Sequence, residues 1–114
     1  MAFEDLIVLA RQALAPVEEV PAQLPEPLVY VVLSAGGNVY TAINDRFDDA
    51  IRALQADRDT AVLKILTMWK SGAIDLPSYA FRSALLELNA ANSNTELLVQ
   101  GAAGRFVKKL GNTM

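Results

Sequence analysis

The segment Leu28–Leu33 constrains the fold more than any other part of the chain, because it forms an unbroken apolar run. β-branched and aromatic residues in such succession are typical of a strand that is covered on both faces. The run therefore predicts a strand at the centre of a sheet. After a turn at 36–38, which contains two glycines, Val39–Ile43 supplies a second strand. We expect these two segments to form a β-hairpin.

A helix is predicted at the start of the chain, over residues 2–14. Its apolar residues recur at helical spacing, with charged and amide side chains on the opposite face. The apolar set is Phe3, Leu6, Ile7, Ala10 and Leu14. Residues 15–27 contain four prolines and three glutamates, and proline neither continues a helix nor joins the interior of a sheet. We expect a Pro-rich acidic connector inside one globular domain, residues 1–114.

The segment 47–70 keeps a helical rhythm of apolar residues and is predicted as one long helix or two abutting helices. Gly72 can take the left-handed position at its C-terminal end. The polar patch 56–60 leaves an alternative open, because the nearly continuous apolar stretch 61–69 is also compatible with a buried strand. The rhythm rests on Phe47, Ile51, Leu54, Ala61, Val62, Ile65 and Trp69.

The remainder of the chain predicts one more helix and a second hairpin. The turn 74–78 leads into a helix that Asp75 or Ser78 can cap. Residues 95–100 and 105–110 are expected to pair around a glycine-bearing turn. The predicted order is α-ββ-α(α)-α-ββ. This is an α+β fold, in which a small single-layer sheet of two β-hairpins packs with three to four helices.

The chain contains no cysteine and no histidine. These absences exclude disulfides, thiolate zinc sites, a cysteine nucleophile and the Ser-His-Asp triad. We therefore expect no catalytic residue, no metal site and no cofactor. The net charge is −3 and the pI about 4.8, which argues against a general nucleic-acid footprint. The charge is uneven, since residues 1–60 carry net −6 and residues 61–114 net +3.

Three aspartates are grouped at the start of the segment 47–70. Clustered carboxylates can hold a hard cation. Helix capping explains them more simply, with Asn44 or Asp45 as the cap and with Asp48 and Asp49 facing the positive end of the helix dipole. We therefore predict a capped helix start.

Five residues form the candidate protein-binding set. Trp69 and Tyr79 flank the turn before the last helix, and each combines an apolar ring with a polar tip. Arg105, Lys108 and Lys109 form a basic cluster on the last predicted strand. On an exposed strand such charges discourage edge pairing, or they contact an acidic partner.

Two patches of the sequence resemble the cytidine deaminases. Gly37–Asn44 looks like the second strand of that family, and Pro77–Arg82 is similar to its proline-cysteine-x-x-cysteine-arginine segment. Between them, Gln55–Arg58 lies where the zinc-ligand helix motif of the family would start. The resemblance covers about half of the chain.

In this resemblance the zinc-ligand positions hold Gln55, Ser78 and Phe81, and the position of the catalytic glutamate holds Asp57. Such a set would bind no zinc and activate no water. The resemblance therefore implies a dead deaminase. It also gives the alternative fold, an α/β deaminase-like sheet with residues 61–69 as a strand.

The sequence favours a non-catalytic, small acidic cytoplasmic protein that acts by protein-protein binding, in the manner of an immunity, antitoxin or adaptor protein. The alternative is a small-molecule-binding or zinc-less deaminase-like domain. A homo-oligomer stays open, whereas nucleic acid and membrane are not expected as partners. Residues 1–14 lack the basic flank and unbroken apolar run of a signal peptide, which favours the cytoplasm.

Overall fold

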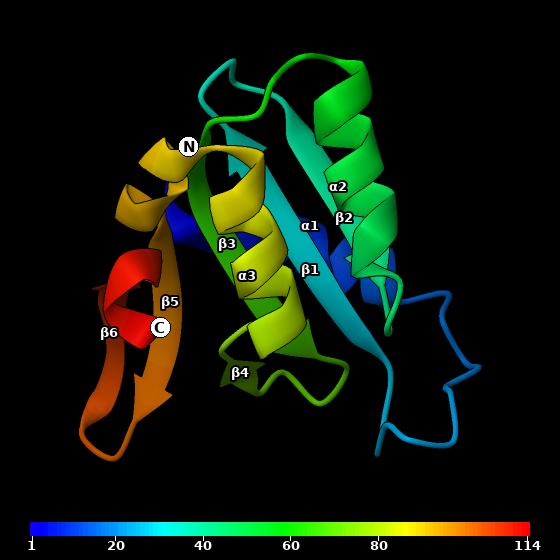
Figure 1. Cartoon of the computed structure of the whole chain (residues 1–114). Coiled ribbons are helices and arrows are strands. Elements are labelled where there is room, and N and C mark those ends of the chain that lie inside the picture. The colour runs from blue at the N-terminus through cyan, green and yellow to red at the C-terminus, as the bar shows by residue number, and fades with distance from the viewer.

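The chain folds into three α-helices, six β-strands and two short 3₁₀ helices, and the computed structural model describes all of it, residues 1–114 (Figure 1). In chain order the elements are α1 (Phe3–Leu14), β1 (Leu28–Ser34), β2 (Val39–Ile43), α2 (Phe47–Ala56), β3 (Val62–Trp69), β4 (Ile74–Asp75), α3 (Tyr79–Leu88), η1 (Ala90–Asn94), β5 (Glu96–Gly101), β6 (Gly104–Lys109) and η2 (Leu110–Thr113). None of the helices has the length and apolar character needed to cross a bilayer.

The strands form one mixed sheet in the order β2-β1-β3-β5-β6, with β4 paired to β3. β1 pairs antiparallel with β2 and β3, and all seven of its residues are buried. β3 and β5 run parallel, and the chain crosses between them through α3. The central strand and the first hairpin are confirmed. The sheet is larger than the two predicted hairpins, because β3 and β4 add a third antiparallel pair.

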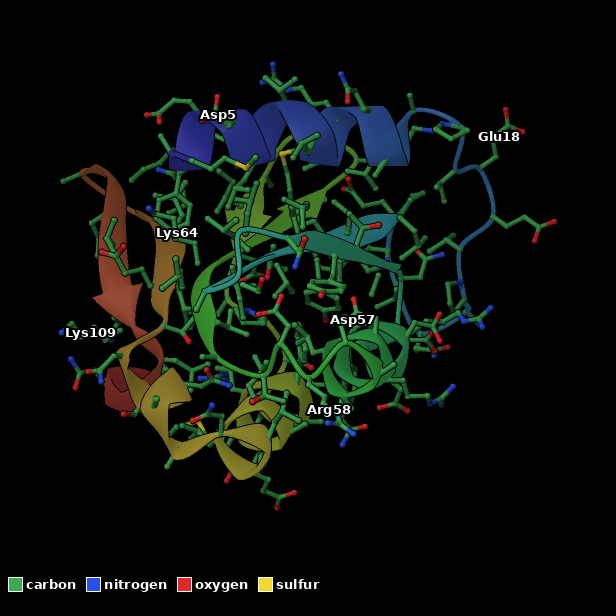
Figure 2. The ribbon with its side chains drawn as sticks, turned by 90° about the horizontal axis from the view of Figure 1, so that it is seen from above. Asp5, Glu18, Asp57, Arg58, Lys64 and Lys109 are labelled. Carbon is green, nitrogen blue, oxygen red and sulfur yellow. The ribbon has the colours of Figure 1, made fainter.

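Helices cover both faces of the sheet, so the fold has three layers (Figure 2). α1 lies on one face, where Leu6 belongs to the same apolar core as Val31 of β1. α2 and α3 lie on the opposite face, where Leu54 and Phe81 share a second core with Val32. Neighbouring residues of β1 therefore point into different cores, which is why the whole strand is apolar.

The prediction of a helix over residues 47–70 is wrong in its second half. α2 ends at Ala56 and β3 follows, so the alternative with residues 61–69 as a strand is the correct one. Ile65–Met68 are four consecutive buried residues, because successive side chains point to the two opposite faces. A strand covered in this way loses the alternation that distinguishes it from a helix. Gly72 has a positive φ of 96°, but in the β3–β4 turn and not at a helix end.

The predicted cap of α2 is also wrong. Arg46 stands at the N-cap position without a side-chain capping bond. Asn44 Oδ1 accepts a hydrogen bond from the N–H of Leu28 at 3.1 Å, and Asp45 accepts one from a glutamine of the connector. The first helix, the second hairpin and the cap of α3 are confirmed. In that cap, Ser78 Oγ accepts from the N–H of Phe81 at 3.3 Å.

One buried amide joins three elements. The side chain of Asn92 in η1 is fully buried, and its Oδ1 accepts from the N–H of Val62 at 2.8 Å. Its Nδ2 donates to the carbonyls of Thr60 and Leu85, at 3.0 and 2.9 Å. The start of β3 and the end of α3 are therefore tied together through one side chain.

Replacing this amide should destabilise the fold strongly. Asn92→Ala leaves one buried N–H and two carbonyls without their partner, which costs about 3 kcal/mol of unfolding free energy. Urea denaturation followed by circular dichroism measures the change. The matched control is Asn94→Ala in the same 3₁₀ helix, because Asn94 is exposed and its loss should cost less than about 0.5 kcal/mol. Equal losses in the two variants would contradict this role for Asn92.

Candidate functional site

The first turns of α2 and α3 lie side by side at one end of the sheet (Figure 1). An aromatic cluster joins them. Phe81 of α3 is fully buried, and its ring stacks on Phe47 of α2 with centroids 5.4 Å apart and planes 29° apart. Tyr30 of β1 meets the same ring edge-on, at 4.9 Å and 61°. Aromatic pairs in these geometries stabilise by about 0.5–1.5 kcal/mol beyond their area burial.

The structure separates the residues that the resemblance assigned to one site. Ser78 and Phe81 stand at the start of α3, whereas Gln55 and Asp57 lie at the far end of α2. A helix rises 1.5 Å per residue, so Gln55 is roughly 12 Å along the axis from Phe47. Zinc ligands must all lie about 2.0–2.3 Å from the metal. These four residues therefore form no common metal centre. The resemblance placed the zinc-ligand helix motif on Gln55–Arg58, and this placement is wrong.

Asp57 belongs to a different cluster, at the loop between α2 and β3 (Figure 2). Its carboxylate accepts from the hydroxyl of Tyr40 at 2.8 Å, and Asp59 lies within 3.1 Å of the same hydroxyl. Desolvation, followed by the bonds to the two carboxylates, raises the pKa of Tyr40 above its ordinary value. The phenol therefore stays protonated and acts as a hydrogen-bond donor.

Asp59 ties the α2–β3 loop to the first hairpin. Its carboxylate accepts from the hydroxyl of Ser34, from Asn38 Nδ2 at 3.0 Å and from the N–H of Gly36 at 3.2 Å. These donors, the Ser34 hydroxyl first, hold the pKa of Asp59 below its usual value. With its oxygens occupied in this way, the carboxylate is a structural clamp and not a free acid or base.

The clamp predicts a defined pH dependence. The folded-state pKa of Asp59 is depressed, so its stabilisation is complete above the unfolded-state pKa and is lost as pH falls through the folded value. Asp59→Asn should therefore lower Tm most near neutral pH, and the gap to the wild type should narrow as pH is lowered from neutral through about 4 and below. Thermal melts across that range measure it. Glu87→Gln, at an exposed position, is the control, and a gap that stays constant with pH would contradict the clamp.

The structure gathers no metal-ligand set. No group of three histidine, cysteine, aspartate or glutamate side chains comes together in the chain. At the start of α2, the carboxylate of Asp49 forms ion pairs with Arg46 at 3.2 Å and with Arg52 at 3.8 Å. Asp45 accepts from Gln23 Nε2 at 2.7 Å. The three carboxylates therefore do not converge on one point.

A groove of about 510 Å³ lies directly before α2. The connector forms one wall and the end of β2 with the following turn forms the other. The side chain of Asn44 holds the walls together, because its Nδ2 donates to the carbonyl of Glu19 at 3.1 Å. A volume of this size suits a small organic ligand. The lining residues are Val17, Glu19, Val20, Pro21, Ile43, Asn44, Asp45 and Arg46.

The candidate protein-binding residues lie on three different elements, β3, α3 and β6. Trp69 is half-buried, and its Nε1 donates to Asp75 Oδ2 at 3.4 Å. Tyr79 is 66% exposed at the start of α3, where the guanidinium of Arg82 lies 5.8 Å from its ring centroid. The three basic residues all lie on β6 and are exposed.

Sequence reasoning missed the aromatic cluster and the clamp. Phe47 and Tyr30 were assigned to separate elements, and nothing local indicates that both meet Phe81. Asp59 lies in the polar patch 56–60, and its hydrogen-bond partners are more than twenty residues away in the sequence. The usable signal was the phenylalanine at a position where the deaminase segment has a cysteine.

No family model matches the chain, and no curated protein matches it by sequence. Its structure is similar to that of the cytidine deaminase from Mycobacterium leprae, with a TM-score of 0.75 and 15% identity, over 100% of this chain and 98% of that one. For the cytidine deaminase from Mycobacterium tuberculosis the TM-score is 0.71 and the identity 19%, over 99% and 94%. For the Burkholderia pseudomallei enzyme the values are 0.73 and 15%, over 100% and 97%. The chain thus has an α+β, cytidine deaminase-like fold.

Proposed function

We propose that this chain is a zinc-less, deaminase-like domain that binds a small molecule without deaminating it. One observation carries the proposal: the aromatic cluster in which Phe81, at the first turn of α3, is fully buried against Phe47. Phe81 occupies a zinc-ligand position in the resemblance to the deaminases. An apolar ring there offers a metal no donor atom.

The residues around this position do not fit zinc. Ser78, the other position in the same segment, accepts from the N–H of Phe81 and so serves as the helix cap. The neighbouring element is the first turn of α2, which presents Phe47 to this point. Zinc sites are built from cysteine, histidine and carboxylate ligands at short distances. No deamination step through a metal-activated water is therefore assigned to this chain.

The groove before α2 is the place proposed for a ligand. It lies next to the aromatic cluster in the chain, since Arg46 lines it and Phe47 follows. Its walls combine apolar side chains with the carboxylates of Glu19 and Asp45 and the guanidinium of Arg46, and charged groups of this kind could orient a polar ring compound. Because the structural relatives are cytidine deaminases, cytidine and uridine are the first compounds to test.

The loss of the metal chemistry is tested directly. The protein is produced in cells grown with added zinc, purified and dialysed. We expect its zinc content, measured by mass spectrometry, to be well below one zinc per chain. We also expect no conversion of cytidine to uridine by absorbance. The Mycobacterium leprae enzyme, prepared in parallel, is the positive control. Stoichiometric zinc together with turnover of cytidine would overturn the proposal.

Ligand binding is tested with a pair of surface variants. A compound that binds the folded state raises Tm, and calorimetry gives its affinity. Val20→Glu introduces a charge into the groove and should weaken binding by about tenfold or more. The matched control is Val8→Glu on α1, which is exposed (53%) and outside the groove. Equal effects of the two variants, or no response to any nucleoside, would remove the groove as the binding site.

A second candidate function is protein binding, and a specific observation favours it. β6 is exposed along its whole length, although it carries two large apolar residues. In this case the partner is a polypeptide and the site is the outer edge of the sheet.

A further inference from the structure

β6 ends the sheet, and no strand pairs with its outer side. Figure 1 shows this strand at the margin of the molecule, on the side away from α2. All six of its residues are exposed, including Phe106 at 48% and Val107 at 49%. An exposed sheet edge with apolar side chains is a template for pairing with another chain.

The register identifies the backbone groups that point outward. The N–H of Leu110 donates to the carbonyl of Thr95 at 2.8 Å, in the same register that pairs β5 with β6. Hydrogen-bonded residues alternate in an antiparallel ladder. The odd-numbered residues Arg105, Val107 and Lys109 therefore turn their N–H and C=O groups away from β5. These groups form the free edge.

The side chains of β6 divide between the two faces of the sheet. Val107 is opposite Leu98, so it lies on the α1 face, together with Arg105 and Lys109. On this face a groove of about 410 Å³ runs between the start of α1 and the last two strands. Phe106 and Lys108 lie on the other face. Each face of the strand therefore combines one exposed apolar side chain with positive charge.

We propose that β6 binds an extended acidic segment of another protein, which adds to the sheet as a further strand. Main-chain bonds to the odd-numbered residues supply affinity, and alternate side chains supply specificity. Acidic side chains are placed opposite Arg105, Lys108 and Lys109, and apolar ones opposite Phe106 and Val107. The inference deepens the protein-binding candidate and does not depend on the small-molecule groove.

The charge of the strand decides between an acidic partner and a second copy of the chain. β6 carries three cations and no acid, so two copies paired edge to edge would double the positive charge in one ladder. Like charges directly opposite each other are destabilising. An acidic strand reverses the sign of every such contact. Its association should also be fast and sensitive to salt.

The test uses the full chain and two synthetic peptides. The acidic peptide reads Glu-Glu-Val-Val-Glu between threonine flanks, in the order that an antiparallel strand presents to Lys109 through Arg105. The second peptide has lysine in place of each glutamate. We expect saturable binding of the acidic peptide by fluorescence anisotropy, weakening at high salt, and no binding of the lysine peptide. Amide NMR shifts should centre on β6.

Three variants separate the backbone from the side-chain contribution. Val107→Pro removes an outward N–H, a change that an edge strand tolerates because the bonds to β5 remain. This variant should lower the affinity for the acidic peptide by about tenfold. Val107→Thr keeps the N–H and should change the affinity much less. Arg105→Glu, which is opposite an uncharged glutamine, should weaken binding by about fivefold. Thermal melts establish that each variant is folded.

Four outcomes would overturn the proposal. One is the absence of acidic-peptide binding to the folded wild type, and a second is equal binding to Val107→Pro. A third is a dimer in light scattering that Val107→Pro dissociates, which would make a second copy the occupant. A fourth is tighter binding of a single-stranded oligonucleotide, which would make the strand a polyanion site. None of these outcomes bears on zinc content or cytidine turnover, so this proposal and the preceding one fail separately.

Discussion

The burial of β1 and β3 on both faces is the constraint on which the rest of the structure depends. Each aliphatic side chain that leaves water contributes about 1.5–3 kcal/mol, and the side chains of β1 are divided between two cores. Neither core can close without helices on its side of the sheet. α1 is therefore required on one face, and α2 with α3 on the other, so the layer order follows from two apolar strands.

Local patterns predicted those parts of the fold whose burial is one-sided or whose turns are marked. α1 has a helical stripe, and the two hairpins have glycine-bearing turns between apolar runs. β3 could not be distinguished in the same way, because burial on both faces removes periodicity. The prediction of a helix for residues 61–70 was accordingly wrong, while the strand alternative that the apolar stretch 61–69 left open was correct. The parallel contact between β3 and β5 joins residues about thirty positions apart, and no local signal reveals it.

The geometry of the candidate site could not be predicted from the sequence. The absence of cysteine and histidine already excluded the usual zinc ligands. Which residues meet at the start of α3 depends on tertiary packing, because α2 begins at Phe47 and reaches Gln55 only at its last turn. Asn44 was expected to cap α2, and no role was predicted for Asp59. Each one instead fixes a loop through partners distant in the sequence.

The strands that stabilise the fold are buried in the centre of the sheet, whereas the strand proposed to bind a partner lies at its edge. β6 is the only strand that contains no buried residue, whereas β1 contains no exposed one. Substitutions at exposed positions usually change stability by less than about 0.5 kcal/mol, so the charged positions of β6 are nearly free of the demands of folding. The choice of three cations beside phenylalanine and valine on such a strand is not dictated by the core. The three cations would discourage pairing between copies of the chain, and the exposed apolar area of Phe106 and Val107 is the surface that the proposed partner strand would cover.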